Sequence, residues 1–150
     1  MDTLRLSRRR GKDGEYEYEV VEIAVNGRNL IDLLRQVELP VATREGNPEI
    51  AGSYEGLPPD VVFFPSRHLL DRPNPPHGGE GHVTILECGN CGTPACWPFQ
   101  VRILLDEATV TWCDFSQPHR AGKWTYDALP EFIFDRRQYE AELGWLADRE

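Results

Sequence analysis

Glycine and proline interrupt this chain so often that they leave room for few long regular elements. The 150 residues include 13 glycines and 12 prolines. Proline lacks a backbone N–H donor and has a fixed φ, and glycine favours turns. Six of the prolines lie between Pro58 and Pro76. We therefore expect short strands and helices separated by loops, with residues 71–81 forming an exposed loop that is either a connector or a lid.

Several short segments alternate apolar and polar residues, which is the period of a half-buried strand. Leu4 and Leu6 begin the first segment, and Asp13-Gly14 then predicts a hairpin turn at the end of a basic run. Residues 15–25 form the second strand. Its apolar phase changes after Val20, as at a bulge or in a strand covered on both faces. Strands are also expected at 82–87, 99–105, 108–115 and 132–134, which predict an antiparallel meander.

Two segments have helical spacing. Residues 30–38 place leucines on one face behind Asn29, a good N-cap, and Pro40 is expected to end this helix. Asp135 caps a final helix that carries Tyr139 and Leu143 on its apolar face. The piece at 61–64 is either a strand or a segment laid against the core. The sequence thus predicts one α+β domain over residues 1–150: an antiparallel sheet, built from an N-terminal hairpin and a C-terminal meander, with helices packed on one side.

The net charge of the chain limits the classes of partner that we expect. Sixteen Lys and Arg against 25 Asp and Glu give a net charge of −9. Such a chain repels phosphate backbones, so we expect no nucleic-acid partner, and its acidic surface favours a basic protein partner. No apolar run approaches the ~18 residues of a membrane span. The N-terminus has no apolar region typical of a signal peptide, so we expect a cytoplasmic protein, in which stable disulfides are rare.

Three of the four cysteines fall in one loop between two predicted strands. Cys88 and Cys91 have the C-x-x-C spacing of a metal knuckle, and Gly92 lets the backbone curl beneath the sulfurs. Cys96 is a candidate third ligand. The pattern predicts a Zn²⁺ site at this bend.

The fourth zinc ligand must come from elsewhere in the fold. The candidates are Cys113 on the following strand, His119 just after it, and His82 at the start of the preceding strand. A site closed by four protein ligands would be structural and would staple the hairpin.

Other chemistries compete for the same thiols. Cys88 and Cys91 also have the spacing of a redox dithiol, although the residues after them oppose the helix that such a dithiol needs. Cys113 and His119 could form a nucleophile–base pair. Alternatively, the cysteines are small buried fillers beside a turn, because cysteine is often fully buried without any chemistry.

The sequence lacks the common catalytic motifs. It contains no H-E-x-x-H, G-x-G-x-x-G, Walker A or G-x-S-x-G pattern. Aromatic residues gather in the second half of the chain and could line a ligand groove or belong to the core. They are Trp97, Trp112, Trp124, Tyr126 and Phe132.

A set of short motifs in the second half is similar to one known family. The motifs are Cys91-Gly92, Cys96-Trp97-Pro98, Trp112 with Asp114-Phe115, Gln117-Pro118-His119-Arg120, and Phe134-Asp135-Arg136 with Tyr139. Together, over about residues 82–146, they resemble an uncharacterised family of small bacterial proteins. That family has no established activity, so the resemblance implies a bacterial cytoplasmic protein and assigns no catalytic residue.

Two functions from different classes follow. The first is a non-enzymatic protein-interaction domain with a cysteine-rich, zinc-stabilised hairpin loop. The second is a metal- or thiol-dependent enzyme that uses Cys88, Cys91 and Cys96. A weaker third option is a small-ligand binder built from the aromatic cluster and the 71–81 loop.

Overall fold

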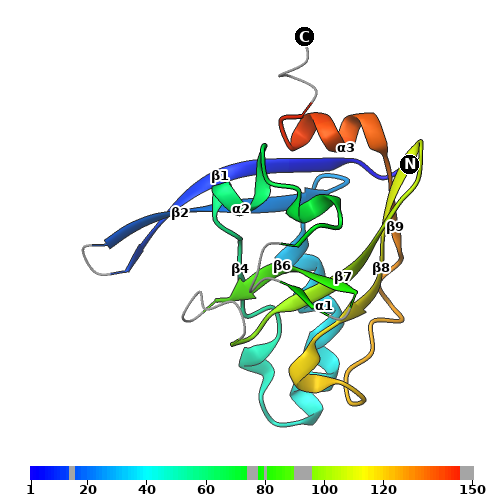
Figure 1. Cartoon of the computed structure of the whole chain (residues 1–150). Helices are drawn as coiled ribbons and strands as arrows, with labels where there is room; N and C mark the ends of the chain where they lie inside the picture. The colour runs from blue at the N-terminus through cyan, green and yellow to red at the C-terminus, as the bar shows by residue number, and fades with distance from the viewer. Residues whose placement is uncertain (14–15, 74–77, 80, 90–95, 146–150) are drawn as a thin grey trace.

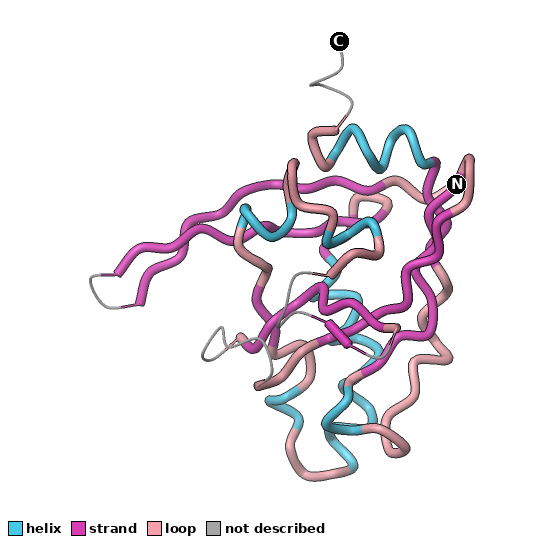
Figure 2. The backbone as a smooth tube through the Cα atoms, viewed as in Figure 1, coloured by secondary structure: helices cyan, strands magenta, loops and turns pink. Residues whose placement is uncertain are grey.

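Two antiparallel sheets and three α-helices form an α+β fold, as the sequence predicts (Figure 1). The computed structural model describes residues 1–13, 16–73, 78–79, 81–89 and 96–145. The first sheet has the order β1-β2-β3, and the second has the order β4-β6-β7-β8-β9, with β5 paired to β6. One hydrophobic cluster of buried residues joins both sheets. Figure 2 shows the helices in cyan beside and between the strands in magenta.

The strands of the first sheet are β1 (Leu4–Asp13), β2 (Tyr16–Val25) and β3 (Arg28–Asn29). Those of the second are β4 (Tyr54–Glu55), β5 (Gly78–Gly79), β6 (His82–Cys88), β7 (Phe99–Leu105), β8 (Thr109–Ser116) and β9 (Phe132–Asp135). The helices are α1 (Leu30–Arg44), α2 (Pro59–Val62) and α3 (Arg136–Glu142). Short 3₁₀ turns lie at Pro48–Ile50, His68–Leu70 and Pro118–Arg120.

The N-terminal hairpin is longer and more regular than its sequence suggested. Its ladder runs without a register shift from Leu4 opposite Val25 to Asp13 opposite Tyr16, so the basic run belongs to β1. The phase change in β2 is therefore not a bulge. Val20 and Val21 are both buried, at 5% and 0% exposure, because this part of β2 is covered on both faces.

The prediction that Pro40 ends the first helix is wrong, because α1 continues through Pro40 to Arg44. Asn29 does cap the helix, since its side chain accepts a hydrogen bond from the Ile31 N–H at 2.9 Å. Pro40 is exposed, whereas Glu38 and Ala42 face the interior. Burial on the inner face thus holds the last turn together despite the backbone hydrogen bond that a proline removes.

The segment between α1 and β6 also departs from expectation in detail. Residues 59–62 form the short helix α2, so the apolar piece predicted at 61–64 is not a strand. A 3₁₀ turn at His68–Leu70 follows α2. Within the predicted irregular loop 71–81, Gly78 and Gly79 pair with β6 as a two-residue strand. Residues 74–77 and 80 lie outside the described part of the chain.

The C-terminal helix is anchored by a buried chain of hydrogen bonds. The Asp135 side chain accepts from the Gln138 N–H at 3.0 Å, which confirms the predicted cap. Trp112 Nε1 donates to Tyr139 Oη at 3.0 Å, and that hydroxyl donates to the Leu69 carbonyl at 2.5 Å. Trp112 and Tyr139 are both 0% exposed. One phenol therefore links β8, α3 and the turn before residue 71.

Replacing Tyr139 with Phe should lower the free energy of unfolding by about 2–4 kcal/mol, because a buried indole N–H and a carbonyl lose their partner. Urea unfolding of Tyr139→Phe, Trp112→Phe and the double variant measures the coupling between the two side chains. Strictly additive effects would contradict the hydrogen bond between them.

Candidate functional site

The predicted zinc ligands of the cysteine loop lie at one end of the second sheet. Cys88 is the last residue of β6, pairs with Tyr54 of β4 and is 4% exposed. Cys96 is exposed and lies three residues before β7 begins at Phe99. Cys91 falls outside the described residues. The two described thiols thus flank the β6–β7 connection, as the sequence predicted.

His119 lies at the same end as Cys96. Its ring stacks on that of Trp97, with centroids 6.0 Å apart and planes inclined by 7°. Arg120 lies over the Trp97 ring at 5.0 Å from its centroid and is 3.7 Å from a carboxylate oxygen of Glu45. His119 therefore lies next to Trp97, the residue that follows Cys96.

Cys113 lies elsewhere on the sheet. It pairs with Arg102 of β7, next to Val101, which itself pairs with Val83 near the start of β6. Cys88 is five residues further along β6 than Val83. At ~3.3 Å per residue this is about 16 Å along the strand, so the sheet does not bring Cys113 and Cys88 together.

The surroundings of Cys113 disfavour nucleophilic chemistry. Burial raises the pKa of its thiol, and the nearby Glu131 and Asp114 carboxylates raise it further, while Arg102 acts in the opposite direction. Since the thiolate is the reactive form, a raised pKa makes a poor nucleophile. His119 is not positioned as its base either, because it stacks on Trp97 before β7 begins, whereas Cys113 pairs with Arg102 in the middle of that strand.

His82, a candidate for the fourth zinc ligand, contacts Asp114. Its Nε2 lies 3.0 Å from Oδ2 of Asp114, which also lies 3.7 Å from Arg102. Asp114 has a φ of 50°, an unusual conformation that coincides with a register shift between β7 and β8. The irregularity turns this carboxylate across the sheet towards β6. Within the described part of the chain, no three His, Cys, Asp or Glu side chains converge as metal ligands.

The most constrained polar group is Glu38, which the sequence analysis missed. It is 1% exposed on the inner face of α1. Its Oε2 accepts hydrogen bonds from Tyr54 at 2.5 Å and Tyr126 at 2.7 Å, and its Oε1 accepts from the Gly52 N–H at 2.8 Å. Gln117 Nε2 donates to the Tyr54 hydroxyl at 3.2 Å. The cluster thus joins four separate segments of the chain.

Burial dominates the electrostatics of this cluster. It raises the pKa of Glu38 above the ordinary 4.5, and the hydrogen bonds from Gly52, Tyr54 and Tyr126 only partly counteract that effect. Burial and the neighbouring acid also raise the pKa of both tyrosines. These phenols therefore stay protonated at physiological pH and act as donors to Glu38. This closed arrangement serves structure, since every polar atom in it has an internal partner.

A pocket of about 250 Å³ opens on the far side of Tyr126. Three of its lining residues are acidic and three are apolar or aromatic: Asp114, Asp127, Glu131, Phe115, Tyr126 and Leu129. This combination suits the aliphatic stem and cationic head of a lysine or arginine side chain.

The aromatic cluster belongs mainly to the core. Trp112, Trp124, Tyr126 and Phe132 are all at most 9% exposed, whereas Trp97 is half-buried. These four buried side chains therefore do not form the wall of an open ligand groove.

The N-terminal hairpin extends past the body of the protein, as Figure 1 shows for the far ends of β1 and β2. Three contacts clamp its base. Arg8 lies 4.9 Å from the Phe63 ring centroid, Arg9 pairs with Glu55, and the Val21 N–H donates to the Leu57 carbonyl at 2.8 Å. We call the portion beyond this base, residues 10–13 and 16–19, the hairpin arm.

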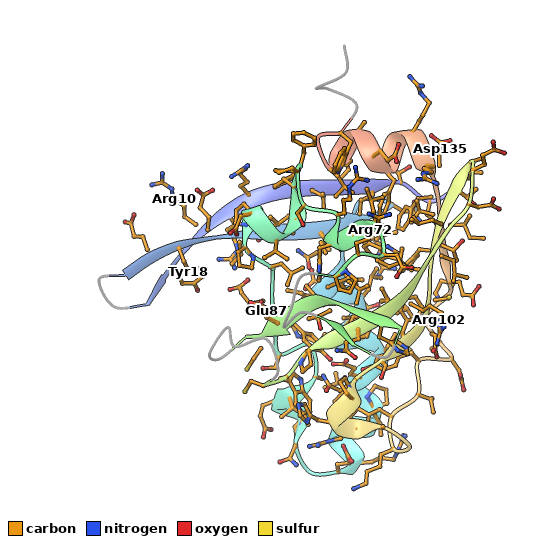
Figure 3. All side chains as sticks on the ribbon, in the orientation of Figure 1. Arg10, Tyr18, Arg72, Glu87, Arg102 and Asp135 are labelled. Carbon is orange, nitrogen blue, oxygen red and sulfur yellow. The ribbon has the colours of Figure 1, made fainter. Side chains whose placement is uncertain are left out.

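Within the hairpin arm, the described side chains contact mainly each other. Gly11 lies against the ring of Tyr18, and a Cβ at Gly11 would approach that ring to 2.3 Å. Arg10 lies 4.0 Å from Glu17, and its side chain is 80% exposed. Figure 3 shows Arg10 pointing away from the strands. The arm is thus a charged two-stranded ribbon outside the core.

Comparisons with known proteins give no relative: no family model, curated protein or solved structure matches the chain. The sequence resemblance to an uncharacterised bacterial family thus stays a prediction. In the part of the chain that the structure describes, no helix has the length and apolar character needed to cross a membrane.

Glu38→Gln should change how stability depends on pH. Because burial raises the pKa of the folded acid, the folded state keeps its proton above pH 4.5, where the unfolded chain has lost it. The free energy of unfolding therefore falls as pH rises through this window. A glutamine cannot ionise, so this part of the pH dependence should disappear. At low pH the variant should keep the stability of wild type to within about 1 kcal/mol, because glutamine offers one donor group and one acceptor group like the protonated acid.

Urea unfolding between pH 4 and 8 measures both effects, with Glu107→Gln as control because Glu107 is exposed. Parallel pH profiles for wild type and Glu38→Gln would contradict the raised pKa.

Proposed function

We propose that this chain is a non-enzymatic protein-interaction domain whose docking element is the hairpin arm. The observation that carries the proposal is the projection of the arm beyond its clamped base (Figure 1). Ordering a residue costs about 1–2 kcal/mol of backbone entropy, and a two-stranded hairpin with no core beneath it is marginally stable. A projecting ribbon adds little to folding, and its exposed groups are available to a partner.

The net charge differs between the N-terminal hairpin and the rest of the chain, which we call the body. Residues 4–25 contain Arg5, Arg8, Arg9, Arg10 and Lys12 against Asp13, Glu15, Glu17, Glu19 and Glu22, so five positive and five negative charges cancel. The remaining residues therefore carry the net −9. Such a body attracts a basic partner and accelerates encounter. The acid-walled pocket beside Tyr126 offers that partner a place for a lysine or arginine side chain.

We further propose that Zn²⁺ stabilises the β6–β7 connection through Cys88, Cys91, Cys96 and His119. The stacking of His119 on Trp97, the residue after Cys96, and the separation of Cys113 from Cys88 favour the histidine over Cys113 as the fourth ligand. Cys88, Cys96 and His119 do not converge in the described structure, so zinc binding would have to bring them together with Cys91. A site closed by four protein ligands would leave no position for substrate and would be structural. The sequence resemblance and the absence of a signal-peptide pattern favour a bacterial cytoplasmic setting.

If zinc is bound, Cys91→Ser should remove it and lower the free energy of unfolding by several kcal/mol. Elemental analysis of protein purified without chelator should find about one zinc per chain. Alkylation should modify the exposed Cys96 rapidly only after chelation, while Cys113→Ser keeps its metal. A metal-free protein whose Cys96 reacts at once would reject the zinc site and favour thiol chemistry.

The arm can be removed without disturbing the base, which gives a test of the interaction function. Arg9 and Val20 are paired, so an Asn-Gly turn can join them directly in place of residues 10–19. Affinity capture from lysate of the source cell should recover a protein with the full chain and lose it with the shortened chain. Calorimetry with the purified partner should then show at least a tenfold loss of affinity.

Two controls accompany this test. Urea unfolding should show that the shortened chain keeps its stability to within about 1 kcal/mol, as expected for a segment outside the core. A body variant, Glu107→Gln, should bind the partner like wild type. Equal binding by the full and shortened chains, or turnover of a small substrate with no protein partner, would contradict the proposed function.

A further inference from the structure

The outer edge of β1 is closed near the body and open towards the arm. In an antiparallel ladder, successive residues of one strand direct their backbone N–H and C=O groups alternately towards the partner strand and away from it. The β1–β2 ladder is regular over its ten pairs, so this alternation continues unbroken along the strand. The side to which the backbone N–H and C=O groups of one β1 residue point therefore determines the side for every other residue of the strand.

Helix α3 closes the first part of this edge. The Leu4 N–H donates to Oε1 of Gln138 at 3.1 Å, and the Leu4 carbonyl accepts from Nε2 of the same side chain at 2.6 Å. The Leu6 N–H donates to Oε2 of Glu142 at 2.8 Å. Two side chains of α3 thus take the place that a neighbouring strand would occupy. These contacts also show that even-numbered residues of β1 point their backbone groups outward.

By the same alternation, Arg8, Arg10 and Lys12 direct their backbone groups to the open side of β1. Among the described residues, none supplies a hydrogen-bond partner to the outward backbone groups of Arg8 or Arg10. A strand edge with unpaired N–H and C=O groups is a template for another strand. The edge is therefore ready for strand addition where α3 ends.

We propose that this open edge of β1 binds an extended partner segment by strand addition, and that the segment carries glutamate or aspartate at alternate positions. The inference rests on the interaction function proposed above and specifies its binding mode. Main-chain hydrogen bonds supply the affinity in such complexes, and alternate side chains supply the specificity. On this edge the alternate side chains include Arg8 and Arg10.

The arginines can accept new carboxylates because their present ion pairs are loose, and Arg8 can do so while its guanidinium stays over the Phe63 ring. Arg8 lies 3.7 Å from Glu19 and Arg10 lies 4.0 Å from Glu17, and the side chains of Arg8 and Arg10 are 57% and 80% exposed. Exposed pairs at such distances are weak. A strand added to β1 would place its side chains directly beside these arginines, where opposite charges stabilise the pairing.

The same charges argue against a second copy of the chain as the occupant. Two β1 edges related by a two-fold axis would set arginine or lysine opposite arginine or lysine along the new ladder, and like charges directly opposite are destabilising. The acidic body does not prevent an acidic segment from binding. Six residues from Arg8 to Asp13 span ~20 Å at the strand rise, whereas charges are screened over ~8 Å at physiological salt. A partner that is basic overall and carries an acidic extended segment would complement both the acidic body and the basic edge of β1.

Synthetic peptides and proline scanning of the arm test the proposal. The probe is a seven-residue peptide of alternating glutamate and threonine, and the same peptide with lysine for glutamate is its control. In an NMR titration, the acidic peptide should slow hydrogen exchange of the Arg8 and Arg10 amides. The Leu4 and Leu6 amides should be protected with or without peptide. The lysine peptide should have no effect.

Arg10→Pro removes one outward N–H, and an edge position with its N–H towards solvent is one that tolerates proline. Arg10→Ala removes the same charge and keeps the N–H. Glu19→Pro removes an N–H from the opposite edge of the same arm. The acidic peptide should bind Arg10→Pro at least tenfold more weakly than Arg10→Ala, and Glu19→Pro should retain binding.

The possible outcomes separate the two proposals. No binding of the acidic peptide, or equal binding by Arg10→Pro and Arg10→Ala, would overturn strand addition at β1 while leaving arm-dependent partner capture intact. Loss of that capture on shortening, with no effect of Arg10→Pro, would have the same meaning. Concentration-dependent dimerisation that Arg10→Pro abolishes would replace the peptide by a second copy. Capture that survives shortening would overturn the interaction function itself.

Discussion

A buried carboxylate determines how the two halves of this protein fit together. Glu38 is on a helix from the first third of the chain, and its strongest partners are Tyr54 before β6 and Tyr126 after β8. A buried acid without partners would be costly, so the three donors and the acid must be assembled at the same time. This requirement also explains why α1 continues past Pro40. The final turn brings Ala42 into the core beside the acid, and the burial outweighs the hydrogen bond that the proline removes.

Side chains and backbone groups from other segments also occupy hydrogen-bonding positions along the outer edges of β9 and of the start of β1. Near the N-terminus, Asp2 closes the outer edge of β9 through its backbone N–H and its side chain, each at 2.8 Å from Ile133. Gln138 and Glu142 close the start of β1. From Arg8 onward the edge of β1 has no such partner among the described residues, and Arg8 and Arg10 keep this edge charged. Charged residues on an edge oppose uncontrolled pairing, so an edge of this kind selects a partner of opposite charge.

The candidate sites differ in how far apart their residues lie in the sequence. The cysteine loop was found from spacing alone, because Cys88, Cys91 and Cys96 are close in sequence. His119 was one of three open choices for the fourth ligand, and only its stacking on Trp97 distinguishes it from Cys113 and His82. The contact between His82 and Asp114 has no local signal, since it depends on an irregularity between two strands. Glu38 did leave a trace, four residues after the buried Leu34 and four before Ala42, on the same face of the helix.

Local pattern by itself determined the strands β1, β2, β6, β7, β8 and β9, the α+β class, and the caps at Asn29 and Asp135, because each depends on residues within a few positions of one another. Only the tertiary structure decided that α1 passes Pro40, that a glutamate occupies the core, and that β1 is covered at one end and open at the other. These features depend on contacts between residues more than ten positions apart, and no local period encodes which distant donor will meet a given acid or strand edge.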